Sequence, residues 1–317
     1  MRAPPPARPR RGTSTSSSGA RCARPKSVVA VARSELSIWA TGQVQPRRQR
    51  DGLYDQAGAV HPAKMWPRIA QSMIEHYSSP GEAVLDPMCG IGTVLIEAVR
   101  ARRHALGVDC EAEWVDVARA NLARARRTHP GTDGTVFCAD ARNLAATLAD
   151  QPGGLPVDLV VTSPPYGPAV HGLPETARKT GGKIVRRAHR YATGKPHPGQ
   201  LARGSSQKRL RTGLASIFGG CHTVLRRGGH MVITARPYTD KGELVDFPAV
   251  VIAAAEDAGF AYTDRHAALL ARWDEADQTL YPHVTLFHLG NVRRQVEAGK
   301  LGIVRAHEDV LVFRKSR

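Results

Sequence analysis

Short apolar segments alternate with amphipathic segments from residue 67 to residue 162, and this alternation restricts the fold more than any other feature. Strands that alternate with helices form parallel sheets, because each helix carries the chain back across the sheet before the next strand. We therefore predict an α/β protein whose mostly parallel sheet is covered by helices on both faces. The expected strands are Ala83–Leu85, His104–Val108, Thr135–Cys138 and Val157–Thr162, and the expected helices are Pro67–Tyr77, Thr93–Arg102, Glu111–Arg126 and Leu144–Ala149.

The alternation stops after the fourth strand, at a basic insertion rich in Gly and Pro that covers Gly167–Thr212. This segment is too long for an ordinary connection in a compact domain, and loops of this length are usually functional or disordered. Regular patterning then returns. It predicts the helices Leu214–Leu225 and Pro248–Ala258, the strand His230–Thr234, and two late strands, Val284–His288 and Asp309–Phe313, that close the sheet as a hairpin.

The net charge of +17 is concentrated in two segments. Residues 1–50 contain 11 Lys and Arg against one acid, and residues 177–212 contain 11 Lys and Arg and no acid, which leaves the remainder of the chain at −4. A polyanionic partner is the first hypothesis, and nucleic acid is favoured over membrane because neither segment is a clean amphipathic helix. The alternative is that both segments are solvated and only increase solubility.

Residues 1–34 are rich in Pro, Ser and Arg and are predicted to be a disordered basic tail before a folded domain at 35–317. A transit peptide and an over-extended start are the alternatives. No apolar run approaches the roughly 18 residues of a membrane span. The five cysteines form no CxxC pair, which disfavours a disulfide framework and a cysteine-based zinc site and fits a cytoplasmic protein. The thirteen histidines show no HxH or HExxH spacing, so no metal site is expected.

The first motif with chemical content is Asp86-Pro87-Met88-Cys89-Gly90-Ile91-Gly92-Thr93, which joins a predicted strand to a predicted helix. Glycines at such a turn let a ligand approach the backbone and the amides at the helix N-terminus. A dinucleotide fingerprint requires a third glycine where this chain has Leu95, so NAD binding is disfavoured. Asp86, at the end of the strand, can meet a cationic ligand such as an amino group; alternatively, it caps the turn.

Two further acids follow the next two strands. Asp109 is placed to accept both hydroxyls of a ribose, and Asp140 can accept the amino group of an adenine. Each could instead cap the helix that follows it. Because the carboxyl ends of parallel strands meet at one edge of a sheet, we expect Asp86, Asp109 and Asp140 to lie together where open α/β folds bind ligands.

The most specific motif is Ser163-Pro164-Pro165-Tyr166, directly after the fourth strand. The two prolines stiffen the backbone, so that a hydroxyl, a carbonyl and an aromatic ring face one cleft. This arrangement suits a planar base with an exocyclic amine. The amine would donate to Ser163 Oγ and the Pro164 carbonyl, which localises the nitrogen lone pair, and Tyr166 would stack on the base. The alternative is a simple Pro-Pro turn.

With these motifs the chain resembles the amino-methyltransferases, which use S-adenosylmethionine to methylate exocyclic amines of nucleic-acid bases. The loop from Asp86 to Thr93 is similar to the family's methionine-binding loop, the motif at 163–166 to its catalytic motif, and His61–Pro67 to the segment before the loop. His307–Lys315 resembles the closing strand of the DNA-modifying branch, and the resemblance covers roughly residues 36–315. It implies a Rossmann-like class I methyltransferase fold, with a mostly parallel seven-stranded sheet, and S-adenosylmethionine as cofactor.

The resemblance also assigns roles to individual residues. Asp86, Gly90 and Gly92 would bind the methionine part of the cofactor, Asp109 the ribose and Asp140 the adenine. The residues expected at the cofactor are His61, Lys64, Asp86, Pro87, Met88, Gly90, Gly92, Thr93, Asp109, Cys110, Asp140 and Ala141, and those expected at the target base are Ser163, Pro164, Pro165 and Tyr166.

The chain departs from the family at two positions. Met88-Cys89 stand where many members have an aromatic residue, and Ser163 stands where adenine-specific enzymes usually have Asp or Asn. By resemblance, Ser163 favours N4 of cytosine in DNA, with N6 of adenine in DNA as an alternative. Tyr166-Gly167 also resembles transfer-RNA guanine methyltransferases, which usually have Asp at the position of Ser163, so a guanine-N2 enzyme acting on RNA is a further alternative.

We therefore expect an enzyme that methylates a base of DNA, rather than RNA, after the base has flipped out of the duplex. The basic insertion is the expected target-recognition segment, since its Lys and Arg can replace phosphate counterions. A DNA-binding protein that keeps the fold without catalysis is the non-enzymatic alternative. It is disfavoured because a pure binder does not need the motifs at 86–93 and 163–166.

Overall fold

The computed structural model describes residues 36–55, 58, 61, 64–149, 156–166, 172–176, 184–188, 195–201, 207–240, 243–284, 286–300 and 302–316, with the backbone alone described for 172–176 and 184–188. The chain divides into two units, Met1–Ala32 and Arg33–Arg317, and every described residue belongs to the second. The predicted disordered tail therefore lies outside the described residues, as do four stretches of the predicted target-recognition insertion.

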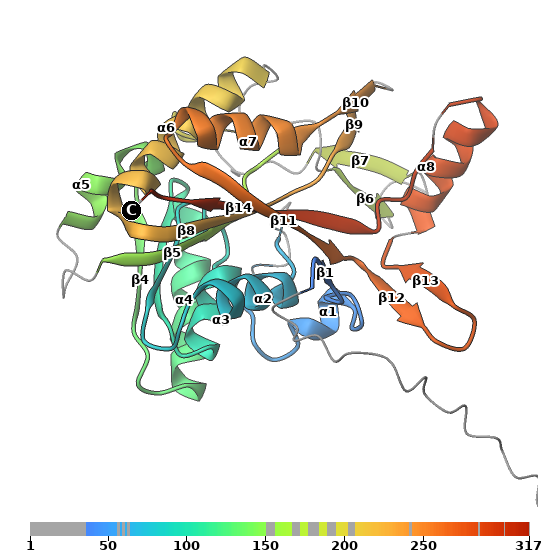
Figure 1. The fold of residues 1–317 in the computed structure, drawn as a ribbon. Coiled ribbons are helices and arrows are strands. Elements are labelled where there is room, and N and C mark those ends of the chain that lie inside the picture. Colours follow the sequence, from blue (N-terminus) through green and yellow to red (C-terminus); the bar gives the residue numbers. More distant parts are fainter. Residues whose placement is uncertain are drawn as a thin grey trace, which may run out of the picture. The chain divides into compact units, whose positions relative to one another are not determined.

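An eight-stranded sheet forms the centre of the described unit (Figure 1). Five of its strands are parallel neighbours, as the alternation of strands and helices predicts. These inner strands are covered on both faces, which is why they are almost continuously apolar in sequence. In spatial order the strands are β1 (Ile38–Trp39), β11 (Ala261–Leu269), β14 (His307–Arg314), β8 (Leu225–Ala235), β5 (Val157–Thr162), β2 (Ala83–Asp86), β3 (His104–Asp109) and β4 (Gly134–Cys138).

β14 is the exception to the parallel arrangement. It pairs antiparallel with β8, where Val312 lies opposite Val232, and antiparallel with β11, where Leu311 lies opposite Arg265. Its place between β8 and β11, although it follows both in the sequence, gives the strand order of the Rossmann-like class I methyltransferase fold. The predicted fold class is thus confirmed, with seven strands in that order and the two-residue β1 added at one edge.

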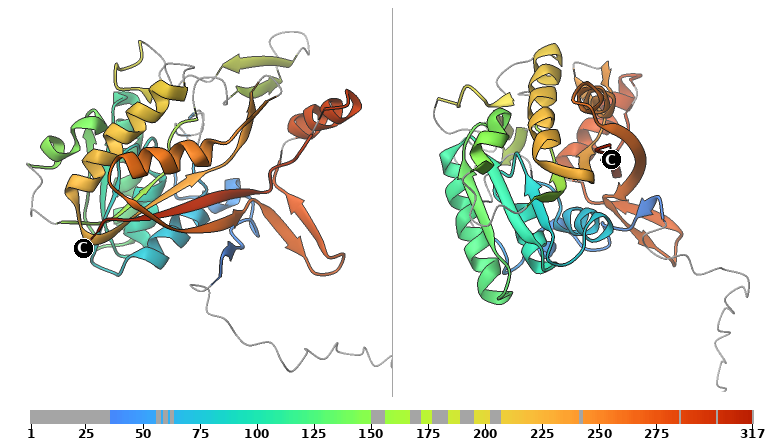
Figure 2. Two further views of the ribbon diagram at one scale, coloured as in Figure 1. Left: turned by 45° about the horizontal axis from the view of Figure 1, so that its top comes forward. Right: turned by 60° about the vertical axis from the view of Figure 1, so that its left-hand side comes forward.

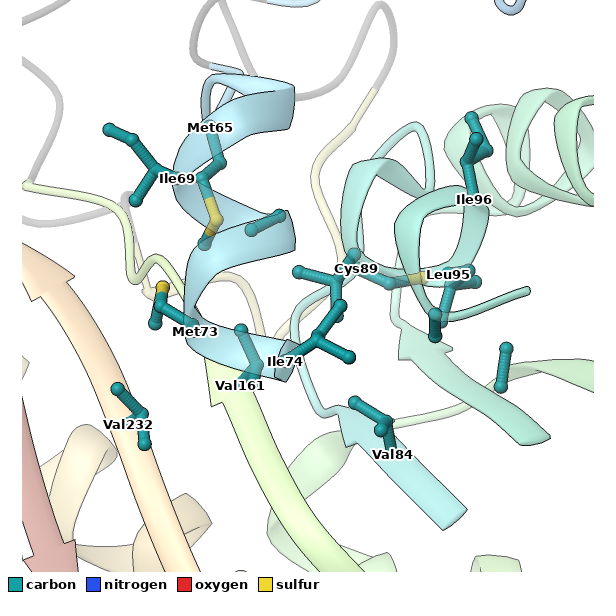
Figure 3. Packing of buried hydrophobic residues seen from close by; sticks show 14 of the residues in the cluster. Met65, Ile69, Met73, Ile74, Val84, Cys89, Leu95, Ile96, Val161 and Val232 are labelled. Carbon is teal, nitrogen blue, oxygen red and sulfur yellow. The ribbon is translucent and has the colours of Figure 1, made fainter. Parts of the chain in front are cut away.

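Helices cover both faces of the sheet and divide the apolar core in two (Figures 1 and 2). On the first face lie α2 (Pro67–Tyr77), α3 (Thr93–Arg100) and α4 (Ala112–Thr128). Their buried side chains pack against strand residues such as Val84 and Val161 (Figure 3). This core holds α3 directly behind the glycine-containing loop and so fixes the position of that loop.

The second face is covered by α5 (Leu144–Ala149), α6 (Gln207–Val224) and α7 (Phe247–Asp257). Leu85 and Val160, the neighbours in sequence of residues that face the first core, point into this second core. That alternation follows from the period of two along a strand. The two cores together fix the sheet whose carboxyl ends carry the predicted site.

Two late strands were predicted to close the sheet as a hairpin. The strand Asp309–Phe313 is confirmed and lies within β14, whereas the strand Val284–His288 is wrong. Leu286–Glu297 forms the helix α8, and the antiparallel partner of β14 on its outer side is β11. An apolar run of this length does not distinguish a strand from a helix. The first five residues of β11 are exposed and include Asp264 and Arg265, so no apolar run marks the strand in the sequence.

Three two-stranded sheets follow the carboxyl ends of central strands, and none of them was predicted. The pairs that follow β8 and β11 lie with α8 on the right of Figure 1, at the end where those strands finish. The three pairs are β6 (Gly172–Thr176) with β7 (Ile184–Ala188), β9 (Tyr238–Asp240) with β10 (Glu243–Val245), and β12 (Ala271–Asp274) with β13 (Thr279–Pro282).

Among the described helices, none combines the length and the hydropathy that crossing a bilayer would require.

The segment that includes β1 and the short helix α1 (Pro46–Gln49) is fixed to the last strands of the sheet. Thr41 Oγ1 donates to the carbonyl of Leu269 at 2.7 Å. The backbone of Gly42 approaches Ala271 so closely that a Cβ would lie 2.5 Å from the nitrogen and 2.6 Å from the oxygen of that residue. These are backbone atoms, which cannot rotate away, so only glycine fits.

We expect Gly42→Ala to lower the free energy of unfolding by about 1–3 kcal/mol, because the added methyl group forces two backbone segments apart. Gly219→Ala is the matched control. Gly219 lies inside α6, and a Cβ there would meet no atom within 4 Å, so alanine should leave stability unchanged or increase it. Urea unfolding of both variants measures the difference, and equal stabilities would contradict the close approach at Gly42.

Candidate active site

A cleft opens at the carboxyl ends of β2, β3 and β5 and brings most of the predicted site residues together. Asp86, Asp109 and Asp140 all line it, as expected from the parallel order of their strands. Gly92, Pro164 and Tyr166 do not line it. The predicted residues in the lining are His61, Lys64, Asp86, Pro87, Met88, Gly90, Thr93, Asp109, Cys110, Asp140, Ala141, Ser163 and Pro165.

Asp86 is a buried carboxylate with one oxygen held and the other available. Thr162 Oγ1 donates to Asp86 Oδ1 at 2.8 Å, and the amide of Met88 donates to the same oxygen at 3.1 Å. Among the described residues, no hydrogen-bond donor reaches Oδ2. Burial raises the pKa of Asp86 to about 7, despite the two hydrogen bonds. A cation that reached Oδ2 would therefore replace lost solvation and favour the ionised form.

The loop between β2 and α3 needs glycine at two positions for different reasons. Gly90 has φ of +48°, and a Cβ there would lie 3.0 Å from His61 Nε2, so glycine keeps the floor of the cleft open. Gly92 has φ of +81°, and a Cβ there would lie 3.3 Å from Ala118 in α4. Gly92 does not line the cleft and allows α3 and α4 to pack closely behind the loop; its predicted contact with the cofactor stays a prediction.

Lys64 supplies a cation to the same cleft. Its Nζ donates to the carbonyls of Gly58 at 3.3 Å and His61 at 2.9 Å. Burial, and then the charge of Arg50, lower the pKa of Lys64 to about 8, so the side chain is still largely protonated at neutral pH. Asp86 and Lys64 thus bring a carboxylate and an ammonium group to one part of the cleft, which is what the zwitterionic end of an amino acid requires.

Asp109 ends β3 and joins two loops. Its Oδ2 accepts the amide of Gly90 at 2.9 Å, and its Oδ1 accepts the amide of Glu111 at 3.0 Å. Burial raises the pKa of Asp109 to about 6. The two amides fix the direction of the carboxylate, and each oxygen keeps a second lone pair that can accept a hydroxyl.

Asp140 both caps a turn and lines the cleft, so each of the two roles considered for it has a structural basis. Its Oδ1 accepts the amide of Arg142 at 3.0 Å, at the start of the 3₁₀ helix η3 (Ala141–Asn143). The guanidinium of Arg142 also bridges the carboxylate, with Nε 2.9 Å from Oδ1 and 3.0 Å from Oδ2. These hydrogen bonds lower the pKa of Asp140, which is therefore ionised at neutral pH.

Residues 197–201, from the predicted insertion, form the outer wall of the cleft; we refer to them as the wall segment. Glu111 holds the wall segment, since its Oε1 accepts the amide of His197 at 3.0 Å and Nε2 of Gln200 at 3.4 Å. A Cβ at Gly199 would lie 2.5 Å from Asp140 Oδ2, so glycine permits the contact with that acid. Sequence analysis predicted neither the wall segment nor the role of Glu111.

The wall segment makes the cleft narrow. The cleft volume is about 90 Å³ with the wall segment in this position. Sites for drug-sized ligands have volumes of about 300–1,000 Å³. The cleft in this structure is smaller than that range, and the wall segment is the part of its lining that Glu111 and Asp140 hold.

The four residues of the predicted catalytic motif have different environments. Ser163 and Pro165 are half-buried and line the cleft, whereas Pro164 and Tyr166 are buried. The ring of Tyr166 packs edge-on against Phe247, with centroids 4.5 Å apart, and parallel to Tyr238 at 6.0 Å. Tyr238 Oη donates to the carbonyl of Tyr166 at 3.2 Å. Stacking of a base on Tyr166 stays a prediction, and it requires access to a ring that is only 6% exposed here.

Nine residues of the lining were not among the predicted site residues. Some of them had a recognisable signal: Cys89 and Ile91 lie inside the predicted loop, and Trp114 lies in the first turn of the helix after Asp109. The ring of Trp114 meets His61 edge-on, with centroids 4.6 Å apart. The wall segment had no such signal, because long-range contacts alone place it. The nine residues are Met65, Cys89, Ile91, Val94, Trp114, Gly199, Gln200, Leu201 and Ile217.

Residues 57–195 match the family model described as UPF0020, RMKL-like, methyltransferase domain. This region contains the glycine loop, the three acids and the motif at 163–166. The strand order is that of the class I methyltransferase fold, and together with the cleft the match supports a methyltransferase with S-adenosylmethionine as its cofactor.

More particularly, the chain is similar to a tRNA (guanine(10)-N2)-dimethyltransferase of Methanothermobacter thermautotrophicus. The two are 34% identical over 131 residues, which are 41% of this chain and 35% of that protein. The chain thus matches about a third of the length of this curated relative.

Two solved structures align with most of the chain at low similarity. A precorrin-6y C5,15-methyltransferase from Geobacter metallireducens is 13% identical, with a TM-score of 0.44, over 88% of this chain and 100% of that chain. A TehB-like SAM-dependent methyltransferase from Corynebacterium glutamicum is 14% identical, with a TM-score of 0.39, over 81% of this chain and 92% of that chain.

Proposed function

We propose that the protein transfers a methyl group from S-adenosylmethionine to the exocyclic N2 amine of guanine in transfer RNA. The similarity to a tRNA (guanine(10)-N2)-dimethyltransferase carries this proposal, and the family match over residues 57–195, which contains the glycine loop, the three acids and the catalytic motif, supports it. The comparisons favour this alternative over N4 of cytosine in DNA, for which they offer no support. An RNA substrate also fits the basic composition of residues 177–212.

The residues of the cleft fit the cofactor group by group. Asp86 Oδ2 would accept the ammonium of its methionine part, and Lys64 would meet the carboxylate. Asp109 would accept the ribose hydroxyls, and Asp140 the adenine amine. When bound there, S-adenosylmethionine supplies an electrophilic methyl group. Gly90 keeps the backbone of the loop close to the ligand, since any side chain at that position would collide with His61.

Ser163 would orient the target amine. Its hydroxyl lies at the end of β5 and lines the same cleft as Asp86, so a base that enters the cleft can place its exocyclic nitrogen between them. Ser163 Oγ would accept one N–H of the amine, and the Pro164 carbonyl would accept the other. These two hydrogen bonds favour a pyramidal nitrogen with a localised lone pair. Positioning of this kind is the main contribution that we assign to the protein.

Proton removal follows methyl transfer in this proposal. A serine hydroxyl is too weak a base to deprotonate the amine beforehand. The nitrogen becomes a strong acid only once the new N–C bond has given it a positive charge, and the proton can then pass to solvent through Ser163. Tyr238 and Phe247 hold Tyr166 and so fix the backbone of the motif during the step.

Incubation with cofactor carrying a labelled methyl group, and with either total transfer RNA or genomic DNA, tests the proposal. Label is expected in transfer RNA, and digestion to nucleosides should yield N2-methylguanosine. Label found only in DNA, or in RNA only on nucleosides that are not methylated at N2 of guanine, would overturn it. Transfer to neither substrate would support a binding protein without catalysis.

Ser163→Ala is expected to lower kcat about 5- to 150-fold, the range that corresponds to one lost hydrogen bond of about 1–3 kcal/mol to the reacting amine. Cofactor affinity should stay within about twofold, because Asp86, Lys64 and Asp109 are unchanged. Ser163→Asp is the informative partner variant. It introduces the carboxylate typical of the guanine enzymes and should recover much of the lost rate. Single-turnover kinetics measures both, and an unchanged kcat in Ser163→Ala would refute the assigned role.

A further inference from the structure

A second cavity lies beyond the wall segment. Its volume is about 510 Å³, several times that of the cofactor cleft. The size is sufficient for a nucleotide with its phosphate. Arg142 from η3 and Lys208 and Arg209 from the first turn of α6 bring three cations to it. Its other lining includes Ser216 and Thr212, whose hydroxyl donates to the carbonyl of Lys208 at 3.0 Å.

The charge of this cavity has one sign. Among the described residues that line it, there is no carboxylate. The side chains of Lys208 and Arg209 are exposed, so the folded protein has not stripped water from their charged groups. Arg142 is the cation nearest the cofactor side, because it bridges Asp140, which lines the cleft. Hydroxyls and amides beside guanidinium and ammonium groups are the donors that bind phosphate oxygens.

The wall segment is shared by the cavity and the cleft. Gly199, Gln200 and Leu201 line both. The wall segment is seated at two points. Gly199 touches Asp140, and Leu201 fits over Gly213 of α6, where a Cβ would lie 2.4 Å from Leu201 Cδ2. A group bound in the cavity is therefore separated from the cofactor by the thickness of one chain segment.

We propose that this cavity binds a backbone phosphate of the RNA substrate, with Lys208 and Arg209 as its principal cations. The inference rests on the proposed function and extends it by naming where the RNA backbone is held. A free inorganic anion could use the same donors, but two exposed cations at the mouth of a cavity of this size suit a phosphate carried on a chain. Lys208 and Arg209 belong to the basic segment 177–212, whose composition suits a polyanionic partner.

The test compares Lys208→Ala/Arg209→Ala with Arg127→Ala. Arg127 is exposed in the last turn of α4, at the opposite edge of the sheet from the cleft, and so controls for the loss of positive charge. The full chain is titrated with an unmodified tRNA transcript from 50 to 200 mM salt, and then with S-adenosylmethionine alone. Methyl transfer to the same transcript is measured in parallel, and inorganic phosphate is added as a competitor.

The cavity variant should bind the transcript at least about tenfold more weakly at 100 mM salt. Its slope of log affinity against log salt should be shallower by about 0.7, since one lost phosphate contact to a single strand contributes about 0.7. KM for the transcript should rise more than kcat falls, and cofactor affinity should match the wild type. Arg127→Ala should change the slope little.

Equal RNA affinities in the cavity variant and the control would overturn the cavity assignment and leave the proposed function standing. Loss of inorganic phosphate competition without any change in RNA affinity would also overturn it, in favour of a site for a free anion. Tight RNA binding by the wild type without formation of N2-methylguanosine would overturn the proposed function, while the salt slopes would still decide the cavity. No RNA binding by the wild type would overturn both.

Discussion

Asp86→Asn is expected to abolish most cofactor binding and, at the same time, to stabilise the protein at pH 8. Loss of one partner of a buried charge pair costs about 2–5 kcal/mol, which weakens binding of S-adenosylmethionine at least about 30-fold. The asparagine Oδ1 can still accept the hydrogen bonds from Thr162 and Met88 that Asp86 Oδ1 accepts. The loss is therefore specific to the ligand.

The gain in stability follows from the sign of the pKa shift. Burial raises the pKa of Asp86 from 3.8 to about 7, so the folded protein holds this proton more tightly than the unfolded chain. Ionisation of Asp86 therefore leaves the free energy of unfolding unchanged below about pH 4 and lowers it by its full amount above about pH 7. A pKa raised by this much corresponds to a loss of about 4 kcal/mol in the free energy of unfolding. Asparagine carries no charge, so Asp86→Asn should recover a large part of that loss.

Thermal unfolding at pH 5 and pH 8 and calorimetric titration with S-adenosylmethionine measure these two effects. The stability difference between Asp86→Asn and the wild type should grow between the two pH values, and the wild type should bind the cofactor more weakly at pH 5 than at pH 8. Asp116→Asn is the matched control, since the side chain of Asp116 is 78% exposed and should show neither effect. A variant that binds normally, or is less stable at pH 8, would contradict the role of Asp86.

Tyr166→Ala is expected to lower kcat/KM for RNA at least about 100-fold, through loss of the stacking platform and of the support for the motif. Cofactor affinity should change less than about twofold, because Tyr166 lies outside the lining of the cleft. The variant should also be less stable by about 3–5 kcal/mol, the usual cost of truncating a buried aromatic residue.

Two conservative variants separate these effects. Tyr166→Phe keeps the ring and should remain active. Tyr238→Phe keeps the ring and removes the hydrogen bond to the Tyr166 carbonyl, and it should lower the rate less than Tyr166→Ala while the protein stays folded. Circular dichroism checks the folded fraction of each. Full activity in Tyr166→Ala would refute any role of the ring in catalysis.

The sequence predicted the first half of the fold closely. α2, α5 and β5 have the predicted bounds, and the three acids at the strand ends line one cleft. These features depend on local patterns: apolar periodicity fixes each element, and a parallel sheet places its carboxyl ends together. The chemistry at the cleft was predictable because it follows from the order of the strands.

The later part of the fold was less predictable, because long-range contacts determine it. β11 is half exposed, and its pairing with β14 fixes its position in the sheet. α6 begins at Gln207 among basic side chains, seven residues before the predicted start. The wall segment reaches the cleft only through contacts with Glu111 and Asp140. The sequence also did not show that Gly92 is required for its positive φ and for the close approach of Ala118 on a neighbouring helix. None of these partners is near in sequence.

The position of β14 has a consequence for how this protein reaches its folded state. β14 lies between β8 and β11, yet it follows both in the sequence. Until it has been synthesised, the sheet consists of two separate pieces, and β8 and β11 each present an unpaired edge of backbone donors and acceptors. Such edges are sites of misassembly, so a nascent chain that has emerged only as far as α8 is the species most exposed to aggregation. The cofactor cleft lies on the larger piece, and its strands can pair before the last strand joins the two.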